Sequence, residues 1–381
     1  MNKKYTLFFL FLALFGTNIA QQRNESQQLI EKGVNAEKLG LLDLATDYYT
    51  QAQASDPEWA LPNYRLGIVA QRRCHYSQAI GHYQQAILLN DTLSDAYARL
   101  AACMIENGNW EPIVVLQGYV EKAIELNPKS ASAYASMAMI NSHQKNYTNA
   151  LHWANRAIEA DPKSPTAFNT LGVIYYHQGK DQEAIQQFRK ALSLDADNLD
   201  AYYNLGVMYV LRNNHETAIN YLRKGLQRDN KSVKLYYYLG VAYIQRGDAQ
   251  KAIACYETII NEIDSLYTPA YNRLGAIYCG KGDYDKAVAY HTKATRIDPS
   301  DPESFKCLGK VYTDRADYPK AIRNYQKAVQ LNDKDHETYC LIAKLYNKQN
   351  NSARETASYK KAAKLGNKEA QQWMVKHGMA W

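Results

Sequence analysis

The chain lacks the short motifs that mark several common kinds of active site. Neither Gly-x-Ser-x-Gly nor His-Glu-x-x-His occurs, which argues against the hydrolases and zinc peptidases that use them. A Gly-Lys pair at 280–281 follows Gly275 at phosphate-loop spacing, but Gly282 stands where a serine or threonine would hold the metal. We therefore expect no enzyme activity, no cofactor and no bound metal.

Cysteine and clustered positive charge are also scarce. The six cysteines contain no Cys-x-x-Cys pair, which argues against a zinc ribbon or a thioredoxin-like redox site. We expect them to be small apolar side chains on helices, while disulfides stay an open alternative. The net charge is +7, but no dense Lys/Arg run exists, so a mixed-charge surface is expected rather than a nucleic-acid partner.

Long apolar runs are absent beyond the N-terminus. Lys3 and Lys4 precede an apolar stretch over residues 5–15, and Ala20 is a small residue before a possible cleavage point. The stretch is shorter than the ~20 residues of a transmembrane helix. Residues 1–20 are therefore predicted to be a secretory signal peptide, with an uncleaved anchor as the alternative. We expect the body of the chain to be exported, to the periplasm or the medium.

Regular repetition is what the sequence has in abundance. Small residues recur at steps of 34 or 35, with one step of 37, at Gly33, Gly67, Ala101, Ala138, Gly172, Gly206, Gly240, Gly275, Gly309 and Ala343. A second series, of alanines, runs in step with it and includes Ala184 and Ala218. Such a period predicts units of two short helices, in which small residues let the helices approach closely. Gly179, Gly247, Gly282 and Asn213 stand where a first helix would end in a left-handed residue.

The unit at 165–198 shows the pattern in full. Its recurring positions are Phe168, Leu171, Gly172, Tyr175, Ala184, Phe188 and Ala191. This pattern resembles the tetratricopeptide-repeat family, and the resemblance covers about residues 26–362. It implies an all-α fold, a right-handed superhelical solenoid of helix-turn-helix repeats with a C-terminal capping helix.

The resemblance divides the chain into a signal peptide (1–20), a short N-terminal segment (21–25), about ten repeat units (26–366) and a capping helix (367–381). The units are 26–59, 60–93, 94–130, 131–164, 165–198, 199–232, 233–267, 268–301, 302–335 and 336–366. The third carries three extra residues around Trp110, which leaves the register of its second helix open. The seventh carries one near Ile263, and Ile259 replaces its usual alanine.

The resemblance also implies a concave groove lined by the first helix of each unit, notably at unit positions 2, 5, 9, 12 and 13. The candidate partner-binding residues at or beside these positions are Asn169, Tyr176, His177, Tyr203, Asn204, Tyr237, Asn272, Lys306, Lys310 and Lys344. The central aromatic and amide residues suit an extended peptide or a partner helix. The C-terminal lysines suit acidic residues or a terminal carboxylate. Alternatively, a tyrosine here packs only on the neighbouring helix.

Together these features predict a non-catalytic scaffold for protein–protein interaction in the cell envelope or exterior. The partner is expected to be a protein or peptide in the concave groove, with membrane contact only through the signal segment. Two alternatives stay open: an accessory subunit for assembly of an envelope or secretion complex, and a glycan- or peptidoglycan-binding module. The oligomeric state is also open, because the ends of a solenoid can pair.

Overall fold

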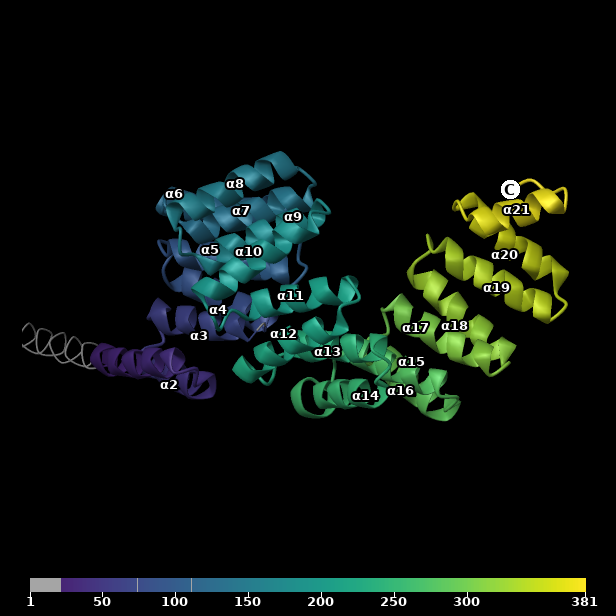
Figure 1. Ribbon diagram of the computed structural model, residues 1–381, viewed down its shortest axis with the longest axis horizontal. Helices are drawn as coiled ribbons and strands as arrows, with labels where there is room; N and C mark the ends of the chain where they lie inside the picture. The colour runs from purple at the N-terminus through teal and green to yellow at the C-terminus, as the bar shows by residue number, and fades with distance from the viewer. Residues whose placement is uncertain (1–21, 74, 111) are drawn as a thin grey trace, which may run out of the picture. The chain divides into compact units, whose positions relative to one another are not determined.

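The computed structural model describes residues 22–73, 75–110 and 112–381, and every described residue in regular secondary structure is helical (Figure 1). The predicted signal peptide lies outside the described residues. None of the described helices combines the length and apolarity that a membrane span requires. The chain divides into two compact units, an N-terminal unit that ends at Leu235 and a C-terminal unit from Tyr236 to Trp381.

Antiparallel helix pairs follow one another along each unit. The described chain starts in a helix over residues 22–38, so residues 22–25 belong to the first repeat helix rather than to a separate segment. The helices of the N-terminal unit are α2 (Leu42–Ser55), α3 (Ala60–Arg72), α4 (Tyr76–Leu89), α5 (Ser94–Glu106), α6 (Ile113–Leu126), α7 (Ala131–His143), α8 (Tyr147–Ala160), α9 (Pro165–His177), α10 (Asp181–Leu194), α11 (Leu199–Leu211) and α12 (His215–Arg228).

Helix α13 (Val233–Gln245) contains the boundary between the two units. The C-terminal unit continues with α14 (Ala249–Thr258), η1 (Ile259–Ile263), α15 (Thr268–Gly280), α16 (Tyr284–Ile297), α17 (Pro302–Asp314), α18 (Tyr318–Leu331), α19 (His336–Lys348), α20 (Ser352–Lys364) and α21 (Lys368–Lys376). The predicted all-α solenoid of paired helices is confirmed.

The turn between the two helices of a unit has the predicted left-handed residue. Gly179, Gly247 and Gly282 have φ values of 74°, 88° and 79°, and Asn213 has 55°. Glycine adopts this conformation without a Cβ clash, and asparagine tolerates it better than most residues. Several first helices also begin with side-chain caps, as where Ser164 Oγ accepts a hydrogen bond from the backbone N–H of Ala167.

In most units the recurring small residue faces a ring on the second helix, whereas Gly206 faces Leu222. A methyl group added at Gly172 would lie 2.5 Å from Cε1 of Phe188, closer than real side chains come. In the unit at 131–164 the ring is replaced by Ala154, and Ala138 takes the place of glycine in the same core. The small residue therefore allows a bulky partner to fill the space between the paired helices.

The three extra residues of the third unit lie in its turn. Six residues separate α5 from α6, whereas three separate α9 from α10. The register of α6 is that of the other second helices, because Leu116, Val120 and Ala123 are all fully buried at the core positions. The insertion thus lengthens an exposed loop and leaves the helix packing intact.

The one extra residue of the seventh unit lies within its second helix. Residues Ile259–Ile263 form a π-helical turn, in which the backbone N–H of Asp264 donates to the carbonyl of Ile259 at 2.7 Å. A π turn takes one residue more than an α turn, so it absorbs the insertion before the next unit begins. Ile259, which replaces the usual alanine, is completely buried there.

The last helix closes the apolar end of the solenoid, as predicted. Met374 of α21 is 1% exposed, and the Trp373 ring stacks on Tyr359 of α20 with 4.4 Å between the ring centroids. A capping helix of this kind keeps the end of a repeat array soluble. Of the described cysteines, Cys103, Cys255 and Cys340 are buried among apolar side chains of their helices.

Candidate binding groove

Three adjoining cavities line the inner face of the N-terminal unit, with volumes of about 550, 440 and 240 Å³. We call them cavities A, B and C, and together the N-terminal groove. Cavity A lies between the ends of the first helix and α3 and the loops before α11 and α13. Cavity B is lined by α5, α7 and α9, and cavity C by α5, α7, α9 and α11. Asp200 lines all three, so the groove is continuous.

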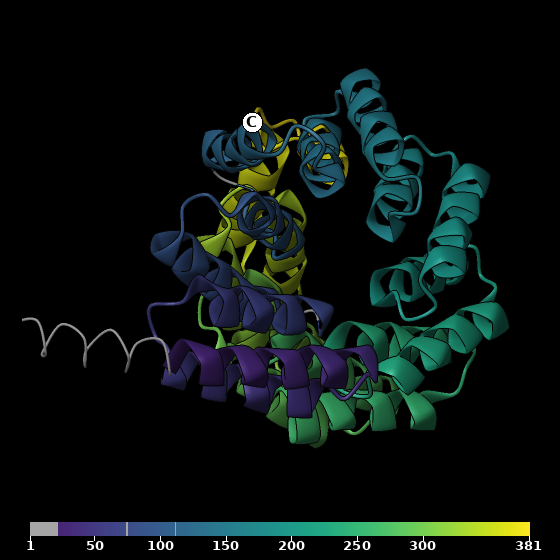
Figure 2. The ribbon, with the colours of Figure 1, turned by 90° about the vertical axis from the view of Figure 1, so that its left-hand side faces the viewer.

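The groove is bridged by contacts between repeats far apart in the sequence. Tyr76 Oη donates to Asp200 Oδ1 at 3.2 Å, and Lys234 Nζ donates to Tyr76 Oη at 3.2 Å. The same ammonium lies 3.5 Å from Glu106 Oε2. In a simple solenoid each repeat touches only its neighbours. Here the helices of the N-terminal unit curve round until its first repeats meet its last, a curvature visible in Figure 2.

The Lys234 ammonium also lies over two aromatic rings. It is 4.3 Å from the centroid of the Tyr76 ring and 5.3 Å from that of Tyr203, which are cation–π distances. We call Tyr76, Glu106, Asp200 and Lys234 the bridging cluster. Partial desolvation by the groove walls and repulsion by Asp200 raise the pKa of Glu106, whose side chain is still 38% exposed, even though Lys234 opposes the effect.

Cavity C combines aromatic, amide, imidazole and carboxylate groups. Its lining residues are Ile105, Glu106, Trp110, Met139, Val173, His177, Asp200, Tyr203 and Asn204. The Trp110 indole, in the inserted loop, stacks on His143 with 3.7 Å between ring centroids and 5° between ring planes. His177 Nδ1 shares a hydrogen bond of 2.9 Å with Ser142 Oγ. Burial and the neighbouring His143 lower the pKa of His177, so its ring stays neutral near pH 7.

The groove thus brings together four of the predicted binding residues. His177, Tyr203 and Asn204 line cavity C, and Asn169 lines cavity B. Tyr176 is 39% exposed on the same helix as His177, but it lines none of the three cavities. Tyr237 and the remaining predicted residues belong to the C-terminal unit.

Side chains at position 5 of a repeat form hydrogen bonds to the next repeat. The sequence left such contact with a neighbouring helix open as an alternative to partner binding. Asn204 Nδ2 donates to Asn169 Oδ1 at 3.0 Å. In the C-terminal unit, Arg273 Nε donates to Tyr237 Oη at 2.9 Å, and Asn272 Nδ2 donates to Ser304 Oγ at 2.8 Å. These residues would have to exchange an internal hydrogen bond for any bond to a ligand.

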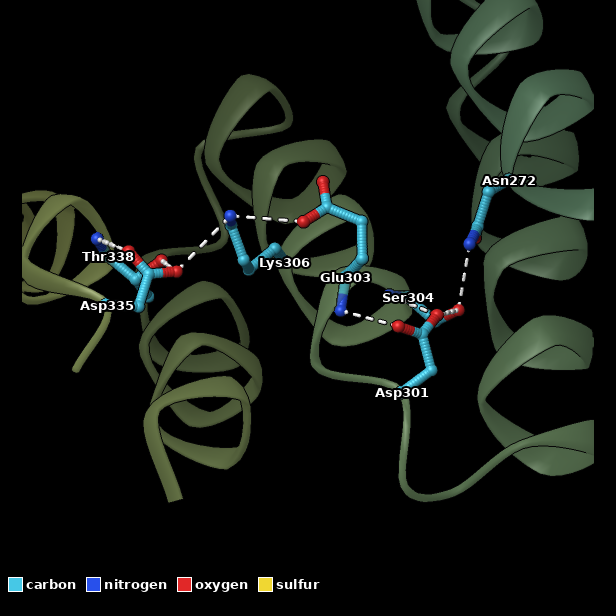
Figure 3. A network of polar contacts seen from close by, with 7 residues as sticks. All are labelled: Asn272, Asp301, Glu303, Ser304, Lys306, Asp335 and Thr338. Atoms are coloured by element: carbon cyan, nitrogen blue, oxygen red, sulfur yellow. Dashed lines mark hydrogen bonds and ion pairs between the residues drawn. The ribbon is translucent and has the colours of Figure 1, made fainter. Parts of the chain in front are cut away.

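The predicted C-terminal lysines are largely neutralised by carboxylates of their own chain. Lys306 Nζ lies 3.1 Å from Glu303 and 3.2 Å from Asp335, as Figure 3 shows. Lys344 Nζ lies 2.9 Å from Glu369. Lys310 is exposed on the first helix of its unit. An acidic ligand would therefore compete with intramolecular ion pairs at two of the three positions.

A buried histidine that the sequence did not single out belongs to the same network. His291 is 1% exposed, and its Nδ1 lies 3.0 Å from Asn272 Oδ1. Asn272 donates in turn to Ser304 Oγ, whose hydroxyl donates to Asp301 Oδ2 at 2.5 Å (Figure 3). Burial lowers the pKa of His291 to about 4, so the ring is neutral near pH 7 and its Nδ1–H donates to Asn272.

Sequence reasoning missed the bridging cluster for a physical reason. Its members come from four different repeats and meet only because the superhelix turns. No spacing of residues along the sequence therefore predicts the cluster. Trp110 could have been noticed as the aromatic residue of an inserted loop. Within the described ranges, no group of three or more histidine, cysteine, aspartate or glutamate side chains is placed to hold a metal.

Comparison with solved structures shows the same fold in several proteins. Yeast Tom70 aligns with a TM-score of 0.53 at 14% identity, over 93% of this chain and 94% of that one. A tetratricopeptide repeat protein from Parabacteroides merdae aligns with a TM-score of 0.51 at 21% identity, over 65% of this chain and 98% of that one. Cut9 in its APC/C hetero-tetramer with Hcn1 aligns with a TM-score of 0.52 at 14% identity, over 88% of this chain and 83% of that one.

Family models match most of the repeat region. Models described as tetratricopeptide repeat match residues 117–165, 153–186, 209–278 and 268–301, and one described as TPR repeat matches 172–211 and 309–350. No curated protein sequence matches the chain significantly. The matched residues amount to more than half of the chain and coincide with the helix pairs of the structure. The chain therefore belongs to the tetratricopeptide-repeat family.

Proposed function

We propose that the chain is a non-catalytic scaffold that holds an extended segment of a partner protein in the N-terminal groove. The repeat family and the solenoid fold support a role in protein–protein interaction. The observation that carries the finer proposal is the continuity of cavities A, B and C along the inner face of one unit. A series of connected cavities suits a chain with several side chains better than it suits one small molecule.

The groove offers the kinds of group that anchor a peptide. Trp110 and Tyr203 present rings at cavity C, and rigid aromatic side chains lose little entropy when they bind. Asn204, beside them, offers its amide oxygen, since its Nδ2 donates to Asn169. Because Tyr203 and Asn204 both lie on α11 and Trp110 stacks on His143 of α7, packed helices fix their spacing before the partner arrives.

Export is part of the proposal and rests on the pattern of residues 1–20. A basic start, a short apolar stretch and a small residue before Gln21 support a secretory signal. Cell fractionation combined with mass spectrometry of the N-terminus tests this. A chain recovered in the cytoplasm that still carries Lys3 and Lys4 would contradict the export proposal and leave the groove proposal in place.

The groove proposal is tested by crosslinking and mass spectrometry in intact cells. The groove variant is Tyr203→Ala with Asn204→Ala, and the matched control is Tyr221→Ala on α12, which lines none of the three cavities. Both must keep the helical circular dichroism of the native chain. Partners that disappear only in the groove variant would support the proposal. Partners that persist in it would move binding to another surface.

A further inference from the structure

The charge of the N-terminal groove is opposite to that of the chain as a whole. The chain carries a net charge of +7. The acidic residues that line cavities A, B and C are Glu37, Asp95, Glu106, Asp161, Asp195, Asp197, Asp200 and Asp229. The basic residues that line them are Lys38, Arg72, Arg99, Lys129 and Arg228. Carboxylates are therefore in excess on the concave surface, where low-dielectric walls focus their field.

Cavity C has the strongest imbalance. Two carboxylates, Glu106 and Asp200, line it together with the rings of Trp110 and Tyr203, whereas no lysine or arginine among the described residues does. Carboxylates and aromatic faces both attract cations, and the two effects act together when a basic side chain lies between them. The apolar residues Ile105 and Met139 complete the wall and suit the aliphatic stem of such a side chain.

An ammonium group of the chain already lies beside this cavity. Lys234 Nζ is 3.5 Å from Glu106 Oε2 and 5.3 Å from the centroid of the Tyr203 ring, and both of these residues line cavity C. The lysine side chain is 29% exposed. Lys234 therefore already places an ammonium group beside the two carboxyl groups that line cavity C.

We propose that the N-terminal groove selects a basic segment of its partner protein, and that one arginine or lysine side chain of that segment enters cavity C between the Trp110 and Tyr203 rings and the carboxylates of Glu106 and Asp200. The proposal rests on the proposed function, since it specifies the chemistry of the segment that the groove holds. The excess of carboxylates along cavities A and B extends the same preference to neighbouring residues of the segment. A partner segment, rather than a free amine, fits a groove that is acidic over three connected cavities.

The test measures binding of the purified full chain to short fluorescent peptides by anisotropy. The peptides have equal length and differ only in carrying arginine, glutamine or glutamate at alternate positions. The arginine peptide should bind at least about tenfold more tightly than the glutamine peptide, and the glutamate peptide should bind weakest. This preference should shrink above about 0.15 M salt, where the Debye length falls below about 8 Å.

Two neutral isosteres locate the interaction in cavity C. Glu106→Gln and Asp200→Asn should each weaken binding of the arginine peptide roughly tenfold, because each removes one negative charge beside the bound cation. The matched control is Glu125→Gln on α6, whose carboxylate pairs with Lys122 on the exposed surface. It makes the same charge change outside the groove and should leave the affinity within a factor of about two.

The Lys234→Met variant shows whether the Lys234 ammonium competes with the ligand cation or stabilises the groove. If the ammonium competes with the ligand cation, its removal strengthens binding of the arginine peptide several-fold. If its removal weakens binding of all three peptides alike and the Glu106→Gln and Asp200→Asn variants keep the preference for arginine, then Lys234 only holds the groove together and cavity C is not the cation site. Circular dichroism and thermal unfolding show whether each variant keeps the native fold.

The outcomes distinguish the preference for a basic segment from the proposed function, which is peptide binding in the groove. Equal binding of all three peptides, with loss in the Tyr203→Ala and Asn204→Ala variant, would overturn the basic preference and leave the peptide groove standing. Tighter binding of the glutamate peptide would also overturn it. No binding of any peptide, together with partners that persist in the groove variant in cells, would overturn both proposals.

Discussion

Replacing His291 by phenylalanine should remove a pH-dependent loss of stability from the C-terminal unit. His291 occupies the position at which other units carry an aromatic ring, such as Phe188, and it is 1% exposed. Burial lowers its pKa from 6.5 to about 4. Above pH ~6.5 the imidazole is neutral in both the folded and the unfolded chain, so it makes no pH-dependent contribution there.

The sign follows from proton binding in the two states. As the pH falls below ~6.5, the unfolded imidazole binds a proton that the folded one does not bind until about pH 4. The free energy of unfolding therefore decreases over this window. The loss at pH 5 is ~2 kcal/mol, and the full pKa difference corresponds to roughly 3 kcal/mol at 1.36 kcal/mol per pKa unit. The unit should become markedly less stable in mild acid.

The assay has to be local, because a repeat array does not unfold as a single cooperative body. Hydrogen exchange measured by mass spectrometry on peptides from α15 and α16, corrected for the intrinsic exchange rate at each pH, reports the free energy of opening around His291. The native chain should lose ~2 kcal/mol more protection than His291→Phe between pH 7 and pH 5. His82 and His177, whose pKa values burial also lowers, are common to both proteins and cancel in the comparison.

At neutral pH the variant leaves Asn272 Oδ1 without its donor, at a cost of ~1–2 kcal/mol, so the absolute stability is not the diagnostic. The diagnostic quantity is the difference in pH dependence between the native chain and His291→Phe. If the native chain and His291→Phe lose the same protection between pH 7 and pH 5, then His291 is not held neutral by burial and the reasoning is wrong.

Two further predictions concern packing and reactivity. Gly172→Ala should destabilise the fifth repeat by ~1–3 kcal/mol, because its methyl group would meet the Phe188 ring, and adding Phe188→Val should restore most of the loss. Hydrogen exchange on peptides from α9 and α10 measures both effects, and an unaffected single variant would contradict the close approach. Burial raises the pKa of Cys255 to about 12. In the folded chain, iodoacetamide near pH 8 should therefore modify Cys255 far more slowly than the partly exposed Cys279. Mass spectrometry measures the two rates, and equal rates would contradict the burial of Cys255.

Much of the fold could be predicted from residue spacing. The glycine and alanine series gave the number and order of helix pairs, because a two-helix unit needs its small residue at the same contact each time. Gly179 and Asn213 marked the turns, because few residues adopt the left-handed conformation. The two irregular units were located but not explained: the sequence did not show that one insertion lengthens a loop while the other, beside Ile263, becomes a π turn.

The candidate site could be predicted only in part. The register of a repeat helix predicted that His177, Tyr203 and Asn204 lie on its inner face, and all three line cavity C. The same register rule also selected Asn169, which accepts a hydrogen bond from Asn204, and Lys306, which forms two internal ion pairs. Register tells which face a side chain is on, but it does not tell whether the next unit already supplies a partner.

The sequence by itself determined the repeat, the pairing of helices within each unit and the closing helix, because all of these depend on contacts between residues close in the chain. Only the tertiary structure decided the chemistry of the groove. Tyr76, Glu106, Asp200 and Lys234 meet because small rotations between successive units add up to a turn, and no neighbouring pair of residues encodes that sum. A chain that is basic as a whole can for this reason enclose an acidic groove.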